Sequence, residues 1–262
     1  MRWLAGLVAV AALFYVAAAT LLYFQQGRLI YPAPQDIAKL PYGFREAELK
    51  TADGLTLRAV YSPARTGRPT VVYFHGNGGT LTGSAAATGH LVAQNYGALL
   101  VEYRGYGGNS GTPSEEGFYA DGRAALRFLI AQGIAADQLI LIGNSIGSGT
   151  ATQLATEIQP KALILGAPFT SLPDAVADKV GWLPVSLLIR DRFDNAGKIA
   201  ELEVPALIQH GQQDSLIAHS HGKRLAQLAP DATFENYSDA GHEVIFTPQA
   251  RIAQVNWLSG LD

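Results

Sequence analysis

Residues 139–147 have the sequence LILIGNSIG, and this stretch decides the fold. The four apolar residues at its start are typical of a buried strand. The Gly-x-Ser-x-Gly pattern that follows predicts a sharp turn between this strand and a helix, with Ser145 on the turn. Side chains at Gly143 or Gly147 would collide with such a turn. The stretch therefore predicts a serine hydroxyl held at the edge of a sheet, in position to act as a nucleophile.

A serine hydroxyl is a weak nucleophile at neutral pH and needs a base. In this arrangement the base is a histidine that follows the serine and an acid along the chain. We predict His242, because it lies in a turn-rich loop after a strand-like run and such loops carry chemistry; a solvated loop histidine is the alternative. His210 ends an apolar run and is expected to be packed at a strand end. His219 and His221 begin a helix and are expected to be surface or capping residues.

The acid that orients the base is predicted to be Asp214, which follows the strand-like run 205–209 by a short loop. Asp239 is the competing candidate. It lies only three residues before His242, and an aspartate at that spacing more often bonds its own turn.

Backbone N–H groups must also face the oxyanion that develops on the substrate. We expect one from Ile146, the residue after the serine, and one from the loop that follows the strand at 70–74. In that loop, His75-Gly76-Asn77-Gly78-Gly79, Asn77 is the first choice and Gly78 the second. His75 is expected to order the loop. The loop lacks the Lys-Ser/Thr ending of a phosphate-binding P-loop, so that interpretation is disfavoured.

Strand and helix patterns alternate from residue 70 onward, which favours a mostly parallel sheet with helices on both faces. A hairpin centred on Asp53-Gly54 is expected to place two antiparallel strands before it. The predicted strands are 45–50, 55–61, 70–74, 98–103, 139–143, 162–166, 205–209 and 233–237, and the predicted helices are 83–94, 114–132, 145–158, 218–228 and 248–258.

These motifs together resemble the α/β-hydrolase superfamily, and in particular its membrane-anchored serine hydrolases of the α/β-hydrolase-domain group. The resemblance extends from about Arg28 to the C-terminus. It rests on the segments 28–32, 75–79, 103–107, 143–149, 190–194, 210–214 and 241–242. It implies an α/β-hydrolase fold and a lipid, acyl or thioester hydrolase, with no metal and no organic cofactor.

Composition limits the other possibilities. The 262 residues suit one catalytic domain and an anchor. A net charge of −3 without a basic block makes nucleic acid an unexpected partner. The absence of cysteine excludes a thiol nucleophile, disulfides and cysteine-ligated metals. The oligomeric state is left open.

The N-terminus is expected to be a membrane anchor. The segment 3–24 has no charged residue and, as a helix, would span about 33 Å. A cleaved signal peptide is the alternative, but its apolar core is usually only about 7–15 residues long. We therefore expect an anchor at 1–25, a linker at 26–42 and the catalytic domain at 43–262. The short N-terminal tail favours a domain on the non-cytoplasmic, periplasmic side, although the flanking charges are balanced.

The segment 168–203 is long for a connection between two strands and predicts a small lid. Its apolar residues are expected to line an acyl pocket, to pack within the lid or, less favoured, to contact the membrane. Arg104 lies in the loop after the strand at 98–103. It is expected to fix that loop through an internal carboxylate, with Glu115, Glu116 and Asp121 as candidates, rather than to bind substrate.

The sequence as a whole predicts a membrane-anchored serine hydrolase that cleaves esters or thioesters with a hydrophobic acyl group through an acyl-enzyme. Ser145, His242 and Asp214 would form the triad. A serine peptidase on the same fold and a non-catalytic membrane-anchored binding module are the alternatives.

Overall fold

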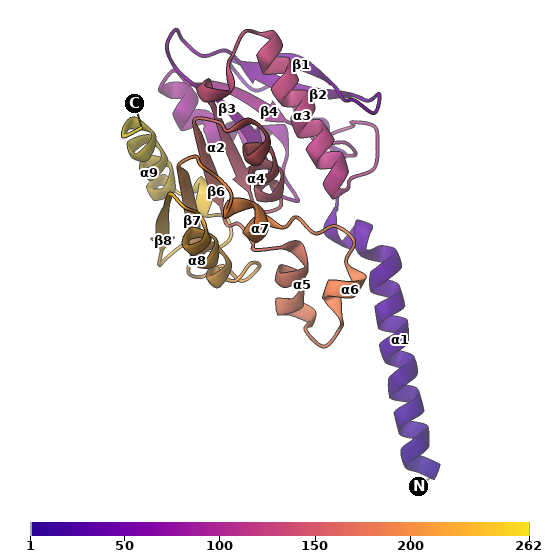
Figure 1. The fold of residues 1–262 in the computed structure, drawn as a ribbon. Coiled ribbons are helices and arrows are strands. Elements are labelled where there is room, and N and C mark those ends of the chain that lie inside the picture. Colours follow the sequence, from indigo (N-terminus) through magenta and orange to yellow (C-terminus); the bar gives the residue numbers. More distant parts are fainter. Residues whose placement is uncertain (1, 262) are drawn as a thin grey trace.

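A single eight-stranded sheet organises the protein in the computed structural model, which describes residues 2–261 (Figure 1). The strand order is β1-β2-β4-β3-β5-β6-β7-β8. The pairs β1–β2 and β2–β4 are antiparallel, and all others are parallel, as the sequence predicted. The strands are β1 (Arg45–Lys50), β2 (Thr56–Ser62), β3 (Thr70–Phe74), β4 (Gly97–Val101), β5 (Leu139–Asn144), β6 (Ala162–Gly166), β7 (Ala206–Gly211) and β8 (Ala232–Tyr237).

Helices cover both faces of this sheet, because successive side chains of a strand point to opposite faces. Val72 and Phe74 of β3 belong to one apolar core, and Val71 and Tyr73 belong to the other. The first core includes residues of α3 (Glu115–Ala131), α4 (Gly147–Ile158) and α8 (His219–Leu228), and the second includes residues of α2 (Leu81–Ala93) and α9 (Pro248–Ser259). Two 3₁₀ turns lie at Ala136–Gln138 and Val244–Phe246.

The N-terminal helix α1 (Arg2–Ile30) projects from the domain (Figure 1). By length and composition it is able to cross a membrane. It continues five residues beyond the expected end of the anchor at residue 25, into the expected linker. The first proline after the apolar segment is Pro32, so nothing before it interrupts the helix. The polar residue Gln26 is buried where α1 meets the domain.

Three short helices occupy the predicted lid between β6 and β7: α5 (Leu172–Val180), α6 (Val185–Leu188) and α7 (Asn195–Ile199). In Figure 1, α5 and α6 lie beside the upper part of α1, below the edge of the sheet. The lid therefore lies between the N-terminal helix and the carboxyl ends of the parallel strands, where ligands bind in open α/β sheets.

Candidate active site

Ser145 lies on a strained turn between β5 and α4. Its φ of 52° falls in the left-handed region, which costs a residue other than glycine about 1–2 kcal/mol. Its N–H donates to the carbonyl of Gly166 on the neighbouring strand, at 2.8 Å, which fixes the turn. A Cβ at Gly147 would overlap the carbonyl oxygen of Phe74, so the first residue of α4 has to be glycine. The strand-turn-helix expected from the sequence is confirmed.

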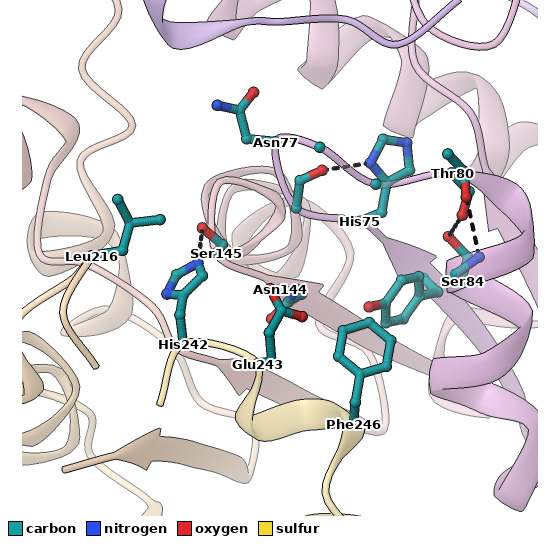
Figure 2. A pocket seen from close by; sticks show the side chains of 15 residues that line it. His75, Asn77, Thr80, Ser84, Asn144, Ser145, Leu216, His242, Glu243 and Phe246 are labelled. Carbon is teal, nitrogen blue, oxygen red and sulfur yellow. Dashed lines mark hydrogen bonds between the residues drawn. The ribbon is translucent and has the colours of Figure 1, made fainter. Parts of the chain in front are cut away.

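The structure brings together the three residues predicted to form a triad. Ser145 Oγ lies 3.0 Å from His242 Nε2 (Figure 2). His242 Nδ1 lies 2.8 Å from Asp214 Oδ2. These side chains come from β5–α4, from the loop after β8 and from the loop after β7. With the carboxylate as acceptor, His242 donates from Nδ1, which leaves Nε2 to accept the serine proton.

The carboxylate of Asp214 is shielded from solvent and strongly hydrogen-bonded. Burial alone would raise its pKa, but donation from His210, His242 and the N–H of Ile217 outweighs this and holds the pKa well below its usual range. Oδ1 accepts the N–H groups of Leu216 and Ile217, at 2.8 and 2.9 Å. Asp214 is therefore positioned as an ionised acceptor that cannot rotate freely.

His210 is packed at the end of β7, as predicted, but it also has a partner that the sequence did not indicate. Its Nε2 lies 3.2 Å from Asp214 Oδ2 and 3.2 Å from the carbonyl of Ile217. The side chain is fully buried. His210 thus helps to hold the carboxylate that faces His242. The spacing of four residues between His210 and Asp214 was the one signal available.

Asn77 and Ile146, the predicted oxyanion donors, both lie beside Ser145 at the wall of one cavity. Within residues 2–261, neither backbone N–H has a hydrogen-bond acceptor. The Asn77 side chain points away from Ser145 and accepts from the hydroxyl of Tyr106 at 3.1 Å (Figure 2). Its backbone, rather than its amide, is therefore the group available near the serine.

The loop that carries Asn77 is held by a buried hydrogen bond between two side chains that sequence reasoning missed. His75 Nε2 lies 2.9 Å from Glu102 Oε1, and His75 Nδ1 lies 2.8 Å from the carbonyl of Gly76. Both side chains of the pair are 2% exposed. His75 therefore orders the loop, as predicted. Glu102 follows β4 at the same edge of the sheet, and this position was the available signal.

The remaining polar candidates have structural contacts. Asp239, the competing acid, is exposed and accepts from Ser238, as expected of a turn residue. The expectation that His219 and His221 are surface or capping residues is wrong for His221, whereas His219 is half-buried at the first position of α8. His221 is buried and links Thr170 to Asp178 of the lid, and His219 packs against His210. The helical pattern indicated the first turn of α8 but not the lid segment that covers it.

Arg104 fixes its own loop, as predicted, and the carboxylate involved is Asp121. The backbone N–H and Nε of Arg104 donate to this fully buried carboxylate at 2.9 and 2.8 Å. The other nitrogens donate to Asp53, at 2.7 and 3.2 Å, and these hydrogen bonds lower the pKa of Asp53 to about 2. The guanidinium is therefore occupied.

Two cavities meet at Ser145. One, of about 400 Å³, is lined by the loop after β3, by His242 and Glu243, by Ser84 of α2 and by the rings of Tyr73 and Phe246. It is the more polar of the two and is called the polar cavity. The other, of about 340 Å³, is lined mainly by apolar side chains of α1, α5 and the lid. Within residues 2–261, no cluster of three or more His, Cys, Asp or Glu side chains is arranged to hold a metal ion. The arrangement places the hydroxyl of Ser145, hydrogen-bonded to His242, where the two cavities meet.

The comparisons agree with this fold, and the chain belongs to the α/β-hydrolase superfamily. The protein is a hydrolase, and its catalytic domain follows an N-terminal apolar helix. A family model described as serine aminopeptidase, S33, matches residues 66–193. The structure of an esterase from Pyrococcus furiosus superposes with a TM-score of 0.69 over 87% of this chain and 97% of the other, at 16% identity.

Two relatives extend the likeness at the level of sequence. An uncharacterized protein of Mycobacterium tuberculosis is 35% identical over 232 residues, which cover 86% of this chain and 82% of the relative. The lysophosphatidylserine lipase ABHD12 of Danio rerio is 29% identical over 229 residues, which cover 78% of this chain and 56% of the relative.

Proposed function

We propose that this hydrolase is a membrane-anchored serine hydrolase that cleaves carboxylic ester or thioester bonds of substrates with a hydrophobic acyl group. The observation that carries the proposal is the continuous series of hydrogen bonds from Ser145 through His242 to Asp214, at the strained turn before α4. This series joins an otherwise weak nucleophile to a base and an orienting acid.

In the proposed reaction, Ser145 Oγ attacks the substrate carbonyl carbon while His242 Nε2 takes the hydroxyl proton. The resulting oxyanion accepts hydrogen bonds from the N–H groups of Asn77 and Ile146. When the bond to the leaving group breaks, His242 returns the proton to the departing oxygen or sulfur, and an acyl-enzyme remains. Water then attacks this ester with His242 again as base, which releases the acid and restores Ser145.

The charge of Asp214 supports the cationic form that His242 passes through in each half of the reaction. Because the pKa of Asp214 is held below its usual range, the carboxylate stays ionised over the range in which a histidine base works. The free N–H groups of Asn77 and Ile146 support their role, since a preorganised donor is worth about 10²–10³ in rate.

We propose that α1 anchors the catalytic domain to a membrane, with the domain on the non-cytoplasmic side. The length and composition of α1 support the anchor. Removal of residues 1–24 is expected to release active protein to the soluble fraction. A truncated protein that still sediments with membranes would point to a second membrane-binding surface.

Peptidase activity is the second candidate, because the matching family model is described as a serine aminopeptidase. Glu243 lines the polar cavity beside His242, and a carboxylate there is able to bind a substrate ammonium group. Aminoacyl-amide substrates test this directly. Hydrolysis of these amides in preference to esters would favour the peptidase.

The first test is labelling of the full-length, membrane-inserted protein with a fluorophosphonate, together with hydrolysis of a short-chain ester. Wild type is expected to react, and Ser145→Ala is expected to lose both signals. Ser84→Ala is the matched control, because Ser84 lines the same polar cavity and its hydroxyl donates to the backbone of Thr80. Folded wild type without any reaction would instead indicate a non-catalytic binding module.

A further inference from the structure

The apolar cavity at Ser145 is partly built from the N-terminal helix. Leu22, Leu29 and Ile30 of α1 line it on one side, and Leu172, Val176 and Val180 line it from α5. Ser145, Asn77 and Leu216 line both this cavity and the polar one. Ser145 therefore lies where the apolar cavity, which begins at α1, meets the polar cavity.

The position of α1 relative to Ser145 is fixed by polar contacts at its last turns. Gln26 is 3% exposed, and its amide donates to the carbonyl of Leu188 at 3.1 Å and accepts the N–H of Arg190 at 2.8 Å. The hydroxyl of Tyr31 donates to Asp191 at 2.6 Å. A buried, fully bonded glutamine at the end of an apolar helix shows that α1 docks on the lid in a defined register.

The lid also exposes large apolar side chains beside α1. Trp182 is 55% exposed and Leu187 is 82% exposed. The Trp182 ring packs edge-on against Tyr15, with 6.1 Å between centroids. Tyr15 precedes Gln26 by eleven residues, which is about 16 Å along the helix. If α1 crosses a bilayer, the tip of the lid therefore lies at the depth of the lipid chains.

We propose that the acyl chain of a membrane lipid enters the apolar cavity directly from the bilayer, between α1 and α5, while its polar leaving group occupies the polar cavity. This inference rests on the proposed serine hydrolase function and specifies its substrate as an amphiphilic acyl lipid. The cavity volume of about 340 Å³ suits a single chain, since small-ligand sites begin at about 300 Å³. The helix α1 is then a wall of the substrate site as well as an anchor.

The test uses full-length protein in phospholipid vesicles and p-nitrophenyl esters from acetate to dodecanoate. Each added CH₂ that enters the cavity is expected to raise kcat/KM about fourfold until the cavity is full. Leu29→Trp and Val176→Trp narrow the cavity from opposite walls. Both are expected to lower kcat/KM for dodecanoate at least tenfold more than they lower kcat/KM for acetate.

Leu13→Trp is the matched control, because Leu13 is an exposed leucine of α1 that does not line the cavity. It is expected to match wild type on every ester. Wild type without chain-length preference, or equal loss on acetate and dodecanoate in both cavity variants, would overturn the inference. Wild type that neither hydrolyses acetate nor reacts with the fluorophosphonate would instead overturn the proposed function itself.

The route of entry is tested with a long-chain acyl phospholipid that does not exchange between vesicles during the assay. The lipid is placed either in the vesicles that hold the protein or in separate vesicles. Hydrolysis is expected only when protein and lipid share a vesicle. Equal rates in both arrangements would overturn entry from the bilayer.

Discussion

Replacement of Asp214 by asparagine tests the triad at the residue whose surroundings are best defined. Oδ1 of Asp214 accepts the N–H groups of Leu216 and Ile217. The amide oxygen of an asparagine is expected to take this position, because an NH₂ group there would face two backbone donors, whereas the histidines at Oδ2 are able to change tautomer. The NH₂ group would then face His242 Nδ1, where the carboxylate Oδ2 lies in the native protein.

This exchange forces a change of tautomer. With an N–H donor opposite Nδ1, the neutral ring of His242 carries its proton on Nε2 and cannot accept the proton of Ser145. The same change in a serine-protease triad lowers turnover about 10⁴-fold, which corresponds to about 5 kcal/mol of transition-state stabilisation. We expect a loss of this size in kcat for a short-chain ester, with KM little changed.

The assay compares Asp214→Asn with Asp239→Asn, which removes the competing acid. Asp239 is exposed, and the hydrogen bond of its carboxylate among the described residues comes from Ser238, so its replacement is expected to leave kcat within twofold. Circular dichroism and thermal melting show whether both variants fold. A folded Asp214→Asn protein with a tenth or more of wild-type activity would refute the assignment, as would a large loss in Asp239→Asn.

The depressed pKa of Asp214 adds a pH-dependent result to the same experiment. A carboxyl group whose pKa is lower in the folded state stabilises the protein above its unfolded pKa of about 3.9 and loses this effect as the pH falls toward the folded value. The fall in Tm between pH 6 and pH 3 is therefore expected to be smaller in Asp214→Asn than in wild type. An equal fall would show that Asp214 does not titrate abnormally.

Three further predictions concern the parts that position the site. Arg104→Met is expected to lower the free energy of unfolding by about 3 kcal/mol, since it leaves the buried Asp121 without a cation; an unchanged denaturant midpoint would contradict this. Gly147→Ala is expected to abolish ester hydrolysis, because the new Cβ overlaps the backbone of β3. Gly89→Ala, at a position of α2 with free space around the new Cβ, is expected to be neutral or to stabilise the protein by up to about 1 kcal/mol, measured by thermal melting. Fluorescence of Trp182, kept as the only tryptophan, should be quenched by lipids labelled in the acyl chain more than by water-soluble acrylamide, and the opposite order would place the lid outside the bilayer.

The sequence predicted the strands of the sheet and the alternation of strands and helices along the chain, because these depend on local patterns. Apolar runs such as 139–142 and 162–165 are long enough to form buried strands, and glycine-rich turns follow them at the edge where the loops gather. The residues predicted for the triad and the oxyanion donors are brought together for the same reason, since each follows a strand of one parallel sheet.

Contacts across long separations were not predictable. His75 and Glu102 are 27 residues apart, and His221 and Asp178 are 43 apart, with no periodicity that relates them. In each case a polar side chain is buried by an element that lies far away along the chain. Its hydrogen-bond partner therefore depends on tertiary packing and not on a local sequence pattern. The short lid helices were missed because helices of four to nine residues are stabilised mainly by the surfaces on which they pack.

The same reasoning explains why the acyl half of the site was the least predictable part. Ser145 and His242, the proposed nucleophile and base, each follow a strand of the same parallel sheet, so the pattern of strands and turns is enough to bring them to one edge. The apolar cavity, in contrast, depends on the docking of α1 through Gln26, a residue that composition assigns to a linker. On the proposed function, the sheet sets the chemistry and the N-terminal helix sets the chain specificity, so the substrate can change without change at Ser145. Substitutions at Leu29 and at Gln26 would then alter chain-length preference while the fluorophosphonate reaction of Ser145 stays the same.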